Sequence, residues 1–340
     1  MGNKMTTFLE LEAEALLKNS KIIKIGKMIN WEKMRYRFNK IHKKTESKSN
    51  FGQKPYDVIS MVKAILLQQW HSLSDHELEE ALYVRIDFLI FCGFNVNTGI
   101  PDETTICRFR NKLAEKKLDK LLLKLVNKQL EEKDLKVKES KGAVVDATII
   151  ESCCRPRKII EIEKDRQEPI GEKDSTESNS KNISIEESKD SEAKWLKKGN
   201  KSYYGYKGFT RTDVEDGYIE DIHIESANVS EMKHLDDIIK DVAEGRRIYA
   251  DKAYGFKENR NSLKEKKLKD ALMRKAVRGR ELTHWEKILN KLISKERYIV
   301  EQNFGTLKRI FKAGESYRGK RKTENQMVFK AISLNFIESI

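Results

Sequence analysis

Two aspartates stand alone among apolar residues in segments that have the composition of buried strands. Asp146 lies within "AVVDATI", and Asp251 follows a short apolar run in "RIYADKAYG". Burying an unpaired carboxylate is costly, so a cation is expected beside each of them. A divalent cation would also relieve the repulsion between the two if their strands are neighbours, because Mg²⁺ takes oxygen ligands from carboxylates, water and phosphate. The pair therefore predicts a metal site suited to phosphoryl chemistry.

A third carboxylate, Glu301, is the candidate to complete this site. It lies in "KERYIVEQNFGTLKRIF", where Arg297 and Lys308 point within roughly 40° of it on a helix. A carboxylate flanked by cations suits a site that holds both metal and phosphate. An apolar stripe at helical spacing would pack this helix on a sheet: Val300, Phe304, Leu307 and Phe311. The alternatives to a metal site are an i, i+4 ion pair between Arg297 and Glu301 on the helix surface, and a turn-capping role for each of the two aspartates.

The spacing of apolar residues along the chain predicts the helices and strands that position these residues. Residues 1–50 are basic and helical in character, and residues 55–130 predict a compact bundle of helices, with a capping box from Ser74 to Glu77 and an N-cap at Asp102. From residue 142 onward the predicted order is strand, strand, strand, helix, strand, helix, strand, helix, with a turn at Asp216–Gly217. This order predicts a mixed sheet covered by helices.

Residues 155–200 interrupt that pattern. Their polar, mixed-charge composition is poor in aromatic residues and predicts a loop or disordered insertion that is mobile and dispensable for folding. Four lysines near its end are expected close to the active site, where they would contact DNA: Lys194, Lys197, Lys198 and Lys201.

Charge and cysteine content narrow the class of protein. A net charge of +14 over 340 residues indicates a polyanionic partner, and nucleic acid fits better than a membrane, because no apolar run approaches the roughly 20 residues of a span. The four cysteines form no CxxC pair, which predicts a reduced cytoplasmic protein without a zinc finger.

Basic clusters offer surfaces for such a partner. The stretch 305–322 holds seven basic residues and one acidic residue, with Tyr317 interleaved, and suits contact with a DNA backbone. A second cluster consists of Arg274, Lys275, Arg278 and Arg280. In the helical region, Arg108, Arg110 and Lys112 would either read DNA or form the solvated face of a packing helix, whereas Trp70 and Phe109 are expected in the core.

These segments together resemble a bacterial insertion-sequence DDE transposase of the IS-Four and IS-Five superfamily, IS-Five branch. "VVDATII" and "YADKAYG" are similar to its first two catalytic strands, and "RYIVEQNFGTLKR" to its third motif. The helical segments "MVKAILLQQWHSLSDHELEEAL" and "PDETTICRFRNKL" are similar to the domain that precedes the core. Two positions depart from the pattern: Ser294 replaces a tyrosine, and Ala253 replaces a glycine.

The resemblance implies an α/β fold, an RNase H-like mixed five-stranded sheet covered by helices, in a catalytic domain over residues 136–340. An all-helical domain over residues 1–135, for DNA-end binding or dimerisation, would precede it. The implied catalytic and metal-binding residues are Asp146, Asp251 and Glu301, holding two Mg²⁺ ions, with Mn²⁺ as a substitute. The expected DNA contacts are Arg297, Lys308, Arg309, Lys252, Lys312, Arg108 and Arg110.

The implied partners are double-stranded DNA, both the terminal inverted repeats and the target, and a second copy of the chain on that DNA. No membrane is involved, and the expected place of action is the cytoplasm of a bacterium, in association with the nucleoid. Two other functions stay open: a structure-specific metal-dependent nuclease, and a DNA-binding protein derived from a transposase that no longer cuts.

Overall fold

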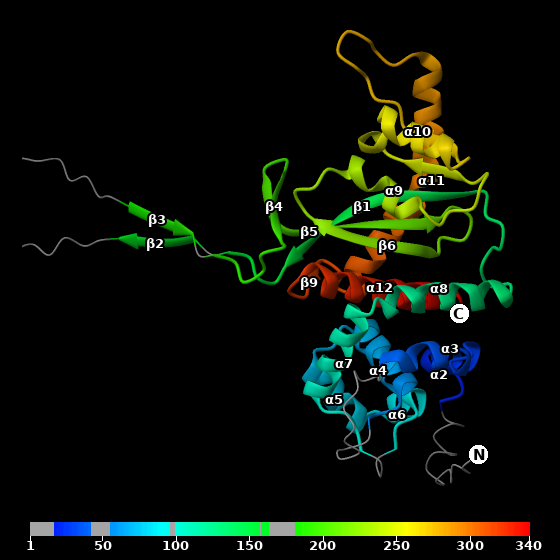
Figure 1. The fold of residues 1–340 in the computed structure, drawn as a ribbon, viewed down its shortest axis with the longest axis vertical. Helices are drawn as coiled ribbons and strands as arrows, with labels where there is room; N and C mark the ends of the chain where they lie inside the picture. Colours follow the sequence, from blue (N-terminus) through cyan, green and yellow to red (C-terminus); the bar gives the residue numbers. More distant parts are fainter. Residues whose placement is uncertain (1–16, 42–54, 96–98, 157, 163–180, 186) are drawn as a thin grey trace, which may run out of the picture.

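A bundle of short helices and a mixed sheet lie on either side of two long helices in the computed structural model of this chain (Figure 1). The structure describes residues 17–41, 55–95, 99–156, 158–162, 181–185 and 187–340. The bundle contains α2 (Lys21–Met28), α3 (Glu32–Phe38), η1 (Asn39–Ile41), α4 (Val58–His71), α5 (Asp75–Val84), α6 (Ile86–Cys92) and α7 (Glu103–Glu115). The two long helices are α8 (Leu118–Glu132) and α12 (Lys320–Glu338).

Two of the predicted helix starts are confirmed. Ser74 and Glu77 form a reciprocal capping box at the start of α5, and Asp102 accepts a hydrogen bond from the Thr105 backbone N–H at the start of α7. These side chains satisfy backbone donors that have no partner inside a helix.

The predicted mixed sheet is also confirmed, but it has seven strands instead of five, because two strands described below pair with the five predicted ones. The five predicted strands are β1 (Gly142–Ser152), β5 (Lys201–Asp213), β6 (Ile219–Ser226), β7 (Arg247–Ala250) and β8 (Lys269–Leu272). They lie in the order β6–β5–β1–β7–β8: β5 is antiparallel to β1 and β6, whereas β7 is parallel to β1 and β8. The turn between β5 and β6 contains Gly217 at φ +77°, a left-handed conformation that glycine adopts without strain.

Helices cover both faces of this sheet. One face packs its apolar residues against α9 (Leu235–Ile239), η4 (Lys252–Tyr254) and α10 (Lys257–Glu265). The short helix η3 (Glu231–His234) contacts the same face through the His234 ring, which lies beside Phe209. The other face packs against α11 (His284–Arg309), whose predicted apolar stripe is buried at Val300 and Leu307 and partly buried at Phe304. The two aspartates lie on the face of the sheet that α11 covers.

The helix α12 joins the two halves of the molecule. It runs with α8 between the sheet and the bundle (Figure 1), and one continuous apolar core contains residues of both helices, of β6 and of the bundle. A boundary at residue 135 therefore divides the sequence into two parts that share one apolar core. The division into 1–135 and 136–340 stays a proposal.

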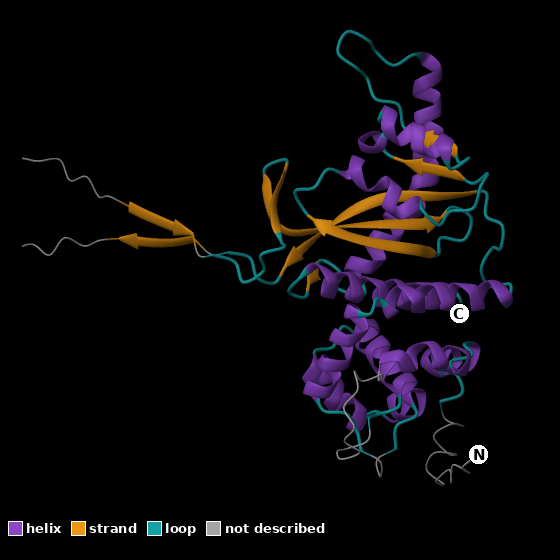
Figure 2. Ribbon diagram, in the orientation of Figure 1, coloured by secondary structure: helices purple, strands orange, loops and turns teal. Residues whose placement is uncertain are grey.

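The segment 155–200 contains more regular structure than its composition predicts. The strands β2 (Lys158–Ile162) and β3 (Lys181–Ile185) form a separate two-stranded sheet that projects from the body, and β4 (Lys194–Lys198) pairs with β5 (Figure 2). The expectation of irregular structure is wrong for β4, because β4 pairs with the first residues of β5, Lys201–Gly205. Residues 163–180, the centre of the expected insertion, lie outside the described residues. A last short strand, β9 (Glu315–Ser316), pairs with β1.

Candidate active site

The two aspartates come from adjacent parallel strands at the same level of the sheet. Val144 of β1 lies opposite Tyr249 of β7, so two residues further along each strand the register brings Asp146 beside Asp251. Neighbouring strands are about 4.8 Å apart, and residues paired in register point to the same face. Both carboxylates therefore lie on the face that α11 covers, where the charge of Asp251 acts on Asp146.

Asp146 is half-buried and has a cationic partner from the chain itself. Burial raises the pKa of this carboxyl above its ordinary value; Arg297 opposes the rise, and the charge of Asp251 adds to it. Arg297 Nη2 on α11 donates to Asp146 Oδ2 at 2.8 Å, and the two side chains are only 14% and 15% exposed. Arg297 thus contacts Asp146, not Glu301, which rules out the simple i, i+4 pair in this arrangement.

Asp251 serves as a cap as well as a candidate ligand. It is the N-cap of η4, and its Oδ1 accepts a hydrogen bond from the Ala253 backbone N–H at 2.7 Å. The capping alternative is therefore correct for one oxygen of Asp251. That bond fixes the position of the carboxylate at the end of β7.

Tyr254, which the sequence analysis did not single out, lies under this pair. Its side chain is fully buried, and its hydroxyl has no hydrogen-bond partner within the described parts of the chain. Burial raises the pKa of Tyr254 well above its ordinary value, and the charges of Glu231, Asp146 and Asp251 add to the effect. The only signal in the sequence is its place in "DKAYG", three residues after Asp251.

Glu301 lies one helical turn after Arg297 and is exposed. It forms no ion pair with any residue that the structure describes. The three carboxylates do not gather with all ligand atoms within 4.8 Å; among described residues only His223, Glu225 and His234 do so. The joining of Glu301 to the two aspartates stays a prediction.

Most of the predicted DNA-contacting cations are exposed. Lys252, Lys308, Arg309 and Lys312 are exposed around α11 and η4, and Arg108 is exposed on α7. Partial burial, followed by the nearby charge of Lys198 on β4, lowers the pKa of Lys308. Lys198 thus lies near Lys308, and the contact of the four lysines of this segment with DNA stays a prediction.

Arg110 does not fit the predicted DNA contact. It is 8% exposed, its guanidinium is hydrogen-bonded to Asp75 and to Gln68 (3.0 Å), and it lies over the Tyr317 ring at 4.6 Å. Its role is to hold α7 against α4 and α5, and Tyr317 packs in the same place instead of facing DNA. The basic stretch 305–322 is likewise partly neutralised, since Arg321 pairs with Asp119 and Lys320 pairs with Glu225.

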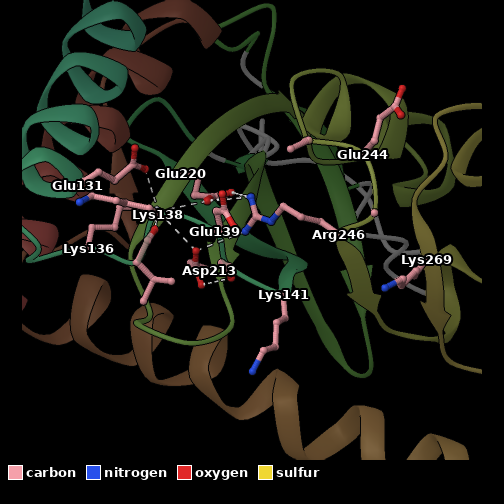
Figure 3. Close-up of a pocket in the computed structure, with 14 residues that line it drawn as sticks. Glu131, Lys136, Lys138, Glu139, Lys141, Asp213, Glu220, Glu244, Arg246 and Lys269 are labelled. Carbon is pink, nitrogen blue, oxygen red and sulfur yellow. Dashed lines mark hydrogen bonds and ion pairs between the residues drawn. The ribbon is translucent and has the colours of Figure 1, made fainter.

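A polar pocket of about 550 Å³ lies at the opposite end of the sheet (Figure 3). Lys136 lies 3.2–3.5 Å from three carboxylates, Glu131, Asp213 and Glu220, and Arg246 lies 3.0 Å from Glu220. These charges neutralise one another where β1 and β7 begin, far along the strands from Asp146. We therefore assign the network to structure and not to catalysis.

Comparison with known proteins identifies the class. A family model described as "Transposase DDE domain" matches residues 138–336, and one described as "Transposase domain (DUF772)" matches residues 10–112. The chain belongs to the DDE transposase family and is a DNA transposase. Membership of the IS-Five branch in particular stays a prediction.

A particular relative has the printed name "Transposase for insertion sequence element IS1106", from Neisseria meningitidis serogroup B. The two are 43% identical over 236 residues, which cover 68% of this chain and 76% of the relative. A solved piggyBac transposase synaptic complex with hairpin DNA aligns with 93% of this chain and 71% of its own, at 10% identity and a TM-score of 0.43. Within the described residues, none of the helices combines the length and apolar character of a membrane span.

Membership of this family implies the use of a divalent metal. The aspartate pair fits that requirement: both donors are oxygen atoms, and Asp146 is half-buried close to the charge of Asp251. Two neighbouring carboxylates with one guanidinium, paired with Asp146, leave a net negative charge that a hard cation would neutralise.

Proposed function

We propose that Asp146, Asp251 and Glu301 form the catalytic site that cuts the ends of an insertion sequence and joins them to target DNA. The observation that supports this proposal best is the register that brings Asp146 beside Asp251 under α11. Water would cleave the phosphodiester, and the freed 3′-hydroxyl would then attack the target, so no protein nucleophile is required.

The proposed roles of the residues follow from their positions. Two divalent ions, Mg²⁺ or Mn²⁺, would stabilise the charge on the attacking and leaving oxygens of the phosphate. Asp146 and Asp251 would hold them, and Glu301 would join when DNA orders the far side of the site. Arg297 would keep Asp146 ionised and aligned until then.

The basic surface around α11 would position the DNA. Lys252, Lys308, Arg309 and Lys312 would contact phosphates next to the cut, and Arg108 on α7 would contact the terminal inverted repeat. We propose that a homodimer brings two element ends together on the DNA, in the cytoplasm at the nucleoid. Residues 1–135 would bind the ends or the partner chain, and residues 136–340 would carry the chemistry.

The deciding experiment is cleavage of the element's own end sequence, taken from the inverted repeats that flank the gene. We expect nicking in Mg²⁺ that a chelator abolishes, and loss of nicking with retained DNA binding in Asp146→Asn, Asp251→Asn and Glu301→Gln. Glu296→Gln, an exposed glutamate earlier on α11, is the matched control and should cut normally.

The same assay separates the alternatives. Joined products with target DNA support a transposase, whereas nicks without joining, at branched DNA of any sequence, would favour a structure-specific nuclease. Binding of the ends without any cleavage in Mg²⁺ or Mn²⁺ would indicate a DNA-binding protein that no longer cuts. Normal cleavage by Glu301→Gln would remove that residue from the site.

A further inference from the structure

A second group of metal-ligating side chains lies on the opposite face of the sheet. His223 and Glu225 of β6 and His234 of η3 offer ligand atoms that all lie within 4.8 Å of one another, and each residue is partly buried. His223 lies opposite Phe209 of β5. Phe209 faces the α9 side, with the core that contains Leu235 and Ile238. This group is therefore separate from the carboxylates under α11.

The ring nitrogens of both histidines are arranged as they are around many protein-bound metals. His223 Nε2 lies 3.1 Å from Glu225 Oε1, yet this buried nitrogen has no hydrogen bond in the described part of the chain. The other nitrogen of His223, Nδ1, lies 3.7 Å from Glu324. Asp237 Oδ2 lies 3.1 Å from His234 Nδ1 and 3.9 Å from His223 Nε2, so this carboxylate is close to both rings. Carboxylates behind the ring nitrogens are the usual second partners of metal-binding histidines.

The surroundings of the group are also suited to a bound ion. The Phe209 ring lies 5.4 Å from the His234 ring and 6.3 Å from the His223 ring, and so shields the two imidazoles from water on one side. Lys320 Nζ lies 3.2 Å from both oxygens of Glu225 and takes the place that a cation would otherwise occupy. This lysine is 38% exposed, so its ammonium can move into solvent.

We propose that His223, Glu225 and His234 bind one transition-metal ion of the Zn²⁺ class. Two imidazoles and one carboxylate select Zn²⁺, Co²⁺ or Ni²⁺ over Mg²⁺, which prefers oxygen ligands only. The site would therefore fill without competing for the aspartates. Because its ligands come from the edge strand β6 and from η3, and its second partners from α9 and α12, the ion would fasten these elements together.

The test is metal binding by the full-length chain after treatment with a chelator, in excess Mg²⁺. We expect one Zn²⁺ per chain by calorimetry, visible absorption bands when Co²⁺ is used, and a rise in melting temperature with added Zn²⁺. His223→Asn and His234→Asn should each weaken Zn²⁺ binding by at least 10- to 100-fold, roughly the loss seen even for second-layer changes. Circular dichroism would verify that these variants fold.

Three further variants test the proposal even if a histidine variant fails to fold. Lys320→Met should bind Zn²⁺ more tightly than the wild type, because Glu225 loses its competing cation. Asp251→Asn and His76→Asn, an exposed histidine on α5, should bind as the wild type does. Absence of Zn²⁺ binding, equal binding by folded His223→Asn, or loss of binding in Asp251→Asn would each overturn the proposal.

Discussion

Arg297 is the cation that partly neutralises the aspartate pair, through its ion pair with Asp146. The sequence analysis assigned it to DNA contact, but its side chain is only 14% exposed and contacts Asp146. Arg297→Ala would leave Asp146 half-buried beside Asp251 without a partner. We expect the free energy of unfolding near pH 7 to fall by about 1–3 kcal/mol, the cost of an unpaired buried group.

The pH dependence of that loss has a definite sign. Burial already raises the pKa of Asp146, and removal of Arg297 should raise it further. The extra loss of stability in the variant should therefore be absent below the pKa of Asp146 in the wild type, grow as pH rises from there to the higher pKa of the variant, and stay constant above it. Denaturant unfolding from about pH 4 to pH 8 measures it.

Added Mg²⁺ should restore more stability to Arg297→Ala than to the wild type, because the ion can replace the guanidinium beside Asp146. Arg297→Lys, which keeps a positive charge, is the matched control and should lose less. A loss that is equal at all pH values and indifferent to Mg²⁺ would show that Arg297 acts through packing alone.

Two arginines on α7 provide a second test, since they are two positions apart and differ in burial. Arg110→Ala removes the charged hydrogen bonds to Asp75 and should cost about 1.5–3 kcal/mol of stability. Arg108→Ala should leave stability within about 0.5 kcal/mol but weaken binding to the terminal repeat, because it is exposed. Thermal unfolding and DNA titration measure the two effects, and the reverse pattern would refute both assignments.

The burial of Arg110 could have been read from the sequence. It shares a helical stripe with Ile106 and Leu113, both fully buried, whereas Arg108 is off that stripe. The contact between Arg297 and Asp146 could not, because helical spacing gives the face of a side chain but not the strand beneath it. The register between β1 and β7, which brings Asp251 to Asp146, likewise depends on pairing between segments 105 residues apart, as Gly142 and Arg247 are (247 − 142).

At the scale of elements, the segment that leads into β4 depends on Asp190. This carboxylate is 2% exposed and accepts hydrogen bonds from Ser152 Oγ at 2.7 Å and from Tyr206 Oη at 2.6 Å. It ties the end of β1 to β5. Composition predicted a loop for this segment but not the contacts of Asp190, because one buried aspartate among exposed polar residues leaves no periodic signal.

Asp190→Ala should therefore cost about 2–4 kcal/mol, because two buried hydroxyls lose their acceptor. Lys189→Ala, at the exposed neighbouring position, should change stability by less than about 0.5 kcal/mol. Hydrogen exchange should also show faster opening of β4 in Asp190→Ala than in the wild type. Unchanged exchange in β4 would mean that pairing with β5 alone holds the strand.

At the scale of the whole molecule, the sequence predicted two units, and this division stays a proposal because one apolar core contains residues of both. The sequence did not predict that α12 would be buried on all sides between them. A helix without an exposed face lacks the amphipathic stripe from which packing partners are inferred. Every residue of α12 from Thr323 to Phe336 is buried, including the polar ones. The spacing of its apolar residues therefore does not indicate which face of the helix packs against which partner.

The shared core makes a prediction about cooperativity. Phe336 on α12 is fully buried, and its ring lies 6.5 Å from Trp31 of the helical bundle. Phe336→Ala should lower the free energy of unfolding by about 3–5 kcal/mol through the cavity that it creates. If the two units unfold together, that loss should appear equally in both.

Two tryptophans allow the units to be followed separately. Trp31 is buried in the bundle, and Trp195 is 45% exposed on β4, so chains that retain only one of them report on one unit each. Both reporters should show the same denaturation midpoint, and Phe336→Ala should shift them together, whereas Ile340→Ala, at an exposed position, should shift neither. If only the Trp31 midpoint shifted, the bundle would unfold alone. The proposed boundary near residue 135 would then be a true domain boundary.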